Sequence, residues 1–136
     1  MNGSSTITLT NSSMQFESVT MLDSSATSKT HGINLIQTAA ALNLQVRNSK
    51  FDASSYFDNV LSSINGSYIH AEGGDQIGIN ITQTTFRTGS SKFGGAIYLN
   101  NVNKLSLFFE DTSFENCKAD WSGGALYLGE MDSYSV

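Results

Sequence analysis

The stretches Thr84–Leu99, TTFRTGSSKFGGAIYL, and Thr112–Leu128, TSFENCKADWSGGALYL, follow one pattern. In each, a phenylalanine is followed seven positions later by a second aromatic residue, then by a Gly-Gly pair and a short apolar segment. A segment that recurs in this way is typical of proteins built by stacking one small unit on the next.

The pattern extends toward the N-terminus through two further phenylalanines. The four anchors are Phe16, Phe51, Phe86 and Phe114, at separations of 35, 35 and 28 residues. The segments that end on them read ITLTNSSMQF, LNLQVRNSKF, IGINITQTTF and LSLFFEDTSF. Apolar and polar residues alternate in them, which predicts strands with one buried face. The first segment is the weakest, because Asn11 breaks its inward row. We predict that the four phenylalanines form a ladder in the core.

Turns are expected on both sides of each phenylalanine. Asn48 and Asp111 precede two of them, and their side chains can bond nearby backbone amides. The Gly-Gly pairs suit a tight bend or a close approach of two backbones. The predicted bend glycines are Gly94, Gly95, Gly123 and Gly124. In the first two repeats the matching block is less regular, and longer loops are expected near residues 24–30 and 54–58.

Each unit holds two or three short strands and cannot bury its apolar face alone, but stacked units can. We therefore predict an all-β solenoid of about four coils with 28–35 residues each. The single domain spans residues 1–136, with coils at roughly 6–40, 41–75, 76–103 and 104–136. Neither end carries a polar capping repeat, so both ends are expected to be uncapped. Either the coils continue in a longer solenoid, or copies stack head to tail into a filament.

Composition excludes several classes of protein. The chain of 136 residues has 14% charged residues, a net charge of −5 and no proline. A nucleic-acid binder would be basic. No apolar run approaches the 18 residues of a membrane span, so we expect no membrane insertion. The single cysteine rules out an internal disulfide framework.

The Ser/Thr-x-Phe segment followed by Gly-Gly-Ala-Ile/Leu-Tyr resembles the repeat of the polymorphic outer-membrane proteins, which carry FxxN and GGAI motifs. Residues 94–97 match GGAI fully and residues 123–126 nearly. Cys117 and Gly89 stand where FxxN would place asparagine, so this motif fits poorly. The resemblance covers the second half of the chain. It implies a right-handed parallel β-helix on a cell surface, used in adhesion or as a stalk. Similar repeats occur in large surface proteins of unicellular eukaryotes.

Four N-x-Ser/Thr sequons are candidate glycosylation sites: Asn2, Asn11, Asn65 and Asn80. Some are expected by chance in a chain rich in Asn and Ser. Asn80 is predicted on the outward side of a strand and Asn65 in a turn, whereas Asn11 falls on an inward row. We expect covalent glycans at Asn65 and Asn80 if the source is eukaryotic and secretory, and hardly any if it is bacterial.

No metal site or cofactor is predicted. His31 and His70 do not share a register, so stacking would not bring them together. The acidic pairs Glu110–Asp111 and Asp52–Asp58 fall short of the six to eight oxygen ligands that calcium takes.

An enzyme is the main rival interpretation, because right-handed β-helices often host polysaccharide lyases and glycosidases. Glycosidases need paired carboxylates at a defined separation. Here no acidic pair recurs near a basic residue across coils, so we predict no enzymatic activity. Cys117 is interpreted as a small buried hydrophobe rather than a reactive thiol.

The predicted function is that of a non-enzymatic structural segment of an extracellular or cell-surface glycoprotein, with its own copies or neighbouring coils as partners. The alternative is an adhesin or carbohydrate-binding β-helix, in which exposed aromatic residues such as Tyr56, Phe57 and Phe108 carry the ligand. We expect Trp121 to stack in register with Phe93 in the core. The other interpretation of Trp121 is an aromatic surface that binds a sugar.

Overall fold

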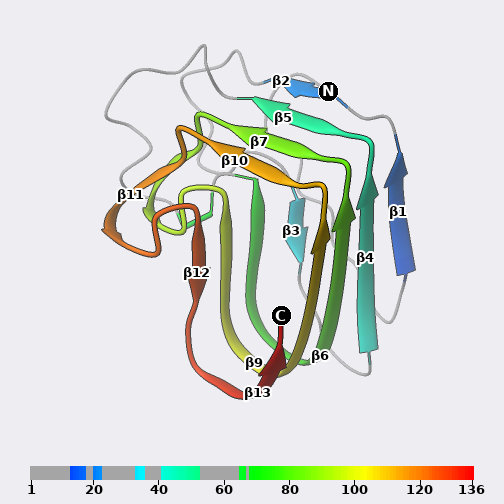
Figure 1. Cartoon of the computed structure of the whole chain (residues 1–136). Helices are drawn as coiled ribbons and strands as arrows, with labels where there is room; N and C mark the ends of the chain where they lie inside the picture. The colour runs from blue at the N-terminus through cyan, green and yellow to red at the C-terminus, as the bar shows by residue number, and fades with distance from the viewer. Residues whose placement is uncertain (1–12, 18–19, 23–32, 36–40, 53–64, 67) are drawn as a thin grey trace.

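The computed structural model describes residues 13–17, 20–22, 33–35, 41–52, 65–66 and 68–136, and all regular structure in these ranges is β (Figure 1). The strands are β1 (Ser13–Glu17), β2 (Thr20–Leu22), β3 (Ile33–Leu35), β4 (Ala41–Arg47), β5 (Lys50–Asp52), β6 (Ile69–Thr82), β7 (Thr85–Arg87), β8 (Ser90–Phe93), β9 (Ile97–Glu110), β10 (Ser113–Glu115), β11 (Lys118–Ser122), β12 (Leu126–Leu128) and β13 (Met131–Ser135). No helix able to cross a membrane is found in this part of the chain.

The strands form three sheets, and every pairing among them is parallel. The largest sheet has seven strands in the order β1-β4-β6-β9-β12, with β3 also on β6 and β13 also on β9. The second sheet has the order β10-β7-β5-β2, and the third joins β11 to β8. The predicted all-β class with parallel strands is therefore confirmed.

The chain visits the sheets in a fixed order. From β6 it passes to β7, β8 and back to β9 in the large sheet, and the next repeat follows through β10, β11 and β12 (Figure 1). The long strands β6 and β9 curve, so that β3 and β4 pair with the two halves of β6, and β12 and β13 with the two halves of β9. Positive φ at Gly73, Gly74 and Asn101 marks these curves.

Inward rows build the core, as the alternation predicted. In β4, Leu42, Leu44 and Val46 are buried and the residues between them are exposed. Leu42 lies opposite Ile77 and Ile77 opposite Leu105, so equivalent residues of successive repeats are neighbours. Each aliphatic side chain buried in such a row contributes roughly 1.5–3 kcal/mol.

The first repeat enters the sheets in a different register from the predicted one. Phe16 lies opposite Val46, and Met21 lies opposite Phe51. The prediction that Phe16 belongs to the phenylalanine ladder is therefore wrong. The observed register places Met14 opposite Leu44, whereas the predicted one would have set polar Asn11 opposite Val46. The start of the predicted first coil lies outside the described residues.

Corners before each phenylalanine share one conformation. Asn48, Gln83 and Asp111 are equivalent, three residues before a ladder phenylalanine, and have φ of 46°, 49° and 48°. Asparagine and aspartate tolerate this left-handed region better than most residues. The residue that follows in each corner is Ser49, Thr84 or Thr112. Its side-chain hydroxyl donates a hydrogen bond to the backbone carbonyl of the residue two positions earlier in the chain. The predicted turns before Phe51, Phe86 and Phe114 are thus confirmed, with a hydroxyl column beside them, whereas the turn predicted before Phe16 is wrong because that segment belongs to β1.

Candidate functional site

The phenylalanine ladder comprises Phe51, Phe86 and Phe114. The centroids of Phe51 and Phe86 are 4.9 Å apart with planes inclined by 17°, and those of Phe86 and Phe114 are 5.2 Å apart at 11°. Phe51 and Phe86 are fully buried. The rings of Phe51 and Phe86 therefore fill the interior, and Phe114 at the end of the ladder is half-buried.

The predicted bend glycines occupy a bend. Gly94, Gly123 and Gly124 have φ of 59°, 92° and 48°. Gly95 lacks a positive φ, but a Cβ there would lie 2.5 Å from the carbonyl oxygen of Lys118. The Gly94 amide donates to the carbonyl of Ser122, one repeat away, at 3.1 Å. Glycine is therefore required here partly by conformation and partly by close approach of two backbones.

Trp121 is not directly opposite Phe93 in the strand register, contrary to the prediction, although the two rings still meet edge to face with centroids 5.7 Å apart. Ser122 lies opposite Phe93, because the register shifts between Ala119 and Ser122. The extra residue forms a bulge, and bulges commonly redirect a side chain. The Trp121 side chain is 71% exposed, and the ammonium of Lys92 lies 4.2 Å from its ring centroid. An exposed cation–π pair of this kind is worth about 0.5–1 kcal/mol.

A second aromatic stack runs along the large sheet through His70, Tyr98 and Tyr127. Successive ring centroids are 5.1 Å apart, with planes inclined by 6° and 7°. Burial lowers the pKa of His70, and the carboxylate of Glu72, 3.9 Å from Nε2, opposes that shift. The residue paired with His70 in the preceding strand is Asn34, and His31 lies outside the described residues. The histidines are not shown to form a pair.

The other ionisable groups considered in the sequence have ordinary structural surroundings, and Cys117 is among them. The thiol of Cys117 is half-buried against the core and donates to the carbonyl of Phe86 at 3.5 Å. Burial raises the pKa of this thiol, which disfavours the nucleophilic thiolate. Asp52 is buried with its carboxylate 3.4 Å from the Lys50 ammonium. Within the described ranges, no group of three or more His, Cys, Asp or Glu side chains could hold a metal ion.

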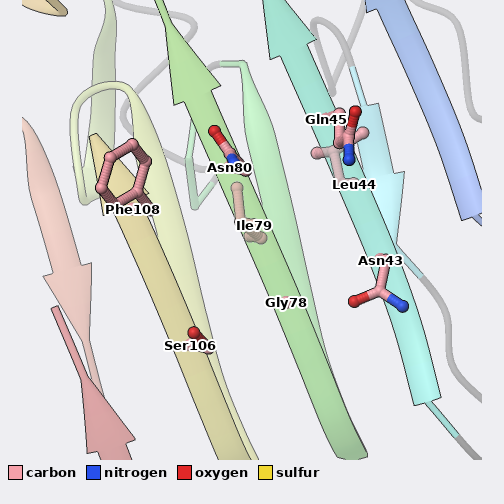
Figure 2. Close-up of a pocket in the computed structure, with 8 residues that line it drawn as sticks. All are labelled: Asn43, Leu44, Gln45, Gly78, Ile79, Asn80, Ser106 and Phe108. Carbon is pink, nitrogen blue, oxygen red and sulfur yellow. The ribbon is translucent and has the colours of Figure 1, made fainter. Parts of the chain in front are cut away.

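A groove lies on the outer face of the large sheet (Figure 2). Its volume is about 250 Å³, and it crosses β4, β6 and β9. The lining residues are Asn43, Leu44, Gln45, Gly78, Ile79, Asn80, Ser106 and Phe108. Three amide side chains supply hydrogen-bond donors and acceptors, and Phe108 supplies an aromatic surface that is 51% exposed. We call this surface the amide groove.

The lining of the amide groove consists of amide, hydroxyl, aliphatic and aromatic side chains and one glycine. Sequence reasoning considered Asn80 and Phe108 separately and did not place them together. The signal was available in the aligned segments, where Gly78 and Ser106 are small residues at equivalent outward positions. Small residues beside an outward asparagine and phenylalanine leave a hollow between them.

The sequons differ in accessibility. Asn80 is exposed on the outer face of β6, as predicted. Asn65 is half-buried, forms an isolated bridge with Phe93 and precedes Gly66, whose φ is 67°. Asn2, Asn11, Tyr56 and Phe57 lie outside the described residues. Attachment of glycans stays a prediction at all four sequons.

Comparisons of this chain with protein-family models, with curated proteins and with solved structures found no match. Its function is therefore inferred from its own geometry.

Proposed function

We propose that the chain is a right-handed parallel β-helix of about four coils that serves as a non-enzymatic structural segment of an extracellular or cell-surface glycoprotein. One observation carries the proposal: each described pairing is parallel, and the pairs β4–β6, β6–β9, β5–β7 and β7–β10 join equivalent positions of successive repeats. A path that passes through three sheets in a fixed order and adds a parallel strand to each is what stacked coils would produce, and it supports the proposal. The right hand of the coil is what the resemblance to the polymorphic outer-membrane protein repeat implies, and it agrees with the general preference of parallel crossover connections.

Self-stacking is supported by the last repeat. Among the described strands, β10 pairs with β7 alone and β12 with β9 alone. Phe114, Leu126 and Leu128 are half-buried, whereas their equivalents one repeat earlier, Phe86, Ile97 and Leu99, are fully buried. This end thus presents apolar side chains beside open strand edges, a surface that templates further pairing. We call it the end face.

The occupant proposed for the end face is another coil of the same kind. In a solution of this chain alone, a second copy supplies that coil, and the contact joins unlike surfaces of the two copies. Contacts between unlike surfaces produce open filaments when the rotation does not close. Four coils at the ~4.8 Å strand spacing predict an axial repeat of about 19 Å.

Light scattering coupled to size-exclusion chromatography, followed by electron microscopy, tests the stacking. The wild-type chain is expected to associate with rising concentration, and Leu126→Lys to remain monomeric because it sets a charge on the end face. Ser106→Lys is the matched control, since it adds the same charge on the outer face. Circular dichroism checks that both variants stay folded. A wild-type chain that remains monomeric at every concentration would contradict self-stacking.

The alternative function is a carbohydrate-binding adhesin, and the amide groove favours it. Amide side chains next to an exposed ring can hydrogen-bond sugar hydroxyls and pack against the apolar side of a sugar. A glycan array probed with the non-glycosylated chain, Phe108→Ala and Asn43→Ala would test it. Specific binding lost in both variants would support an adhesin, and no binding by the wild-type chain would count against one.

A further inference from the structure

We propose that the amide groove is the seat of the first sugar of a glycan attached to Asn80, and that the exposed ring of Phe108 is the surface on which this sugar packs. The inference rests on the glycoprotein part of the proposed function. It goes further because the first sugar of the glycan would bind in the amide groove instead of extending freely into solvent.

The acceptor is presented on the outer face. Asn80 and Thr82, the two required residues of the sequon, alternate with Ile81, which is fully buried in the core. Asn80 and Thr82 therefore lie on the same side of β6, and Asn80 is exposed. The amide nitrogen that would carry the glycan is thus on the surface that contains the amide groove (Figure 2).

Phe108 stands directly beside the acceptor. In the register of β6 with β9, Asn80 lies opposite Phe108. Neighbouring strands of a sheet lie about 4.8 Å apart, so the two side chains leave adjacent backbones on the same face. The other outward residues nearby in β9, Ser106 and Glu110, are polar, so Phe108 is the exception on its face. The C–H groups on one face of a pyranose ring would cover this apolar ring.

The space next to Asn80 suits one sugar ring. Gly78 has no side chain and Ser106 a short one, and both line the groove with Asn80 and Phe108, while the amide of Asn43 lies over Gly78 itself. Its volume of about 250 Å³ falls below the ~300–1,000 Å³ of pockets that enclose a whole small molecule. The groove therefore accommodates the first residue of a glycan, while later residues extend beyond it.

Amide side chains border the same space. A Cβ added at Gly78 would lie 2.6 Å from Oδ1 of Asn43, which shows that Asn43 reaches across the strand toward the groove. Gln45 lies opposite Asn80 on the side away from Phe108. These two amides can exchange hydrogen bonds with the hydroxyl and N-acetyl groups of an N-acetylglucosamine unit, and the ring of Phe108 can pack against its face.

The experiment uses the full chain secreted from a eukaryotic cell line, with glycans trimmed enzymatically to one N-acetylglucosamine. Intact-mass and peptide mass spectrometry report occupancy at each sequon. The melting temperature of this form is compared with that of Asn80→Gln, in the wild-type background and with Phe108→Ser. The expected difference is about 2–4 °C in the wild-type background, as an aromatic contact of ordinary strength would give. It should disappear with Phe108→Ser.

Trp121→Ser is the matched control, because it removes another exposed aromatic side chain from a different sheet. The melting-temperature difference should survive in that background. A second readout is nuclear magnetic resonance of the trimmed wild-type protein, in which the sugar protons should show ring-current shifts and contacts with the Phe108 ring. These signals report the contact directly, whatever the stability of the Phe108→Ser variant.

Two results would overturn the inference while leaving self-stacking intact. The first is an Asn80 without glycan. The second is an occupied Asn80 whose sugar shows no ring-current shift and the same melting-temperature effect in both backgrounds. If every sequon were unmodified, the glycoprotein part of the proposed function would fail too, and the light-scattering result on the end face would still decide the structural part.

Discussion

The rings of Phe51 and Phe86 stack with centroids 4.9 Å apart although 35 residues separate them in sequence. Phe114 continues the stack at 5.2 Å, and this last ring is half-buried. A column of identical side chains thus runs through three repeats and is covered least at its final member. Of the three rings, Phe86 should therefore contribute most to the stability of the fold, because it has a ring on each side.

Phe86→Ala is expected to lower the free energy of unfolding by about 3–5 kcal/mol, because it leaves a cavity between two rings. Phe86→Leu should cost less, since it retains most of the volume. Phe108→Ala, in the non-glycosylated protein, is the control: its ring is exposed, and a change within about 0.5 kcal/mol is expected. Urea unfolding followed by circular dichroism measures all three. Equal losses for Phe86→Ala and Phe108→Ala would contradict a buried ladder.

Gly94→Ala should destabilise the protein far more than Gly124→Ala. Both glycines have positive φ, 59° and 48°, so both variants carry backbone strain. A Cβ at Gly94 would lie 2.1 Å from the carbonyl oxygen of Ile97, whereas at Gly124 it would meet no atom within 4 Å. The strain common to both sites is of the order of 1 kcal/mol. Thermal unfolding of the two variants distinguishes the steric clash, which only Gly94→Ala has, from the backbone strain that both share. Similar melting temperatures would contradict the clash.

Thr84→Val should cost about 1 kcal/mol, and Thr84→Ser much less. The Thr84 hydroxyl is buried and donates to the carbonyl of Thr82 at 2.8 Å. Valine keeps the shape but leaves that carbonyl without this donor, while serine restores the hydroxyl. Denaturant midpoints of the two variants provide the comparison. If valine were as stable as wild type, the hydroxyl column would have no role in the corner.

The unfolding free energy should fall as the pH drops below about 6.5. Burial lowers the pKa of His70 below its ordinary value, so the unfolded chain takes up this proton at a higher pH than the folded one. The contribution of the neutral His70 ring to stability is therefore present above pH 6.5. It is lost progressively as the pH falls toward the pKa of His70 in the folded protein. The measurement is the free energy of unfolding at pH 8 and at pH 5. The decrease between the two should be smaller for His70→Phe than for wild type, and the variant keeps an aromatic ring in the stack with Tyr98.

Glu72→Gln provides the complementary variant. The Glu72 carboxylate raises the pKa of His70 against the effect of burial. Its removal should lower that pKa further and increase the loss of stability between pH 8 and pH 5. A loss in His70→Phe equal to that of wild type would assign the pH dependence to other groups.

Local chemistry explains which parts of the fold could be predicted. Alternation of apolar residues along β4 and β9 fixes which face is buried, and it does so without knowledge of the neighbouring strand. Asn48 and Asp111 were identified as turn residues, and both adopt positive φ. Gly94 and Gly123 also occupy bends, because few other residues tolerate their backbone conformation.

The errors concern register, which depends on two strands at once. Phe16 pairs with Val46 because the first repeat is shifted relative to the second, a shift that the phenylalanine spacing conceals. Trp121 is exposed because one additional residue forms a bulge before Ser122. The amide groove was missed for the same reason, since Gly78 and Ser106 become neighbours only when β6 and β9 are paired.

Repeat length varies in this chain without altering which residues face one another. Residues 53–64 lie between Asp52 and Asn65, whereas the shorter segment 88–92 lies between Arg87 and Phe93 one repeat later. Despite this difference in length, Asn65 forms a bridge with Phe93. Chain can therefore be added between these two fixed points without changing the paired columns. In engineering terms this is a natural insertion point, where an epitope or reporter could be displayed from the scaffold. In evolutionary terms it lets duplicated repeats diverge in their connections while their strands stay compatible.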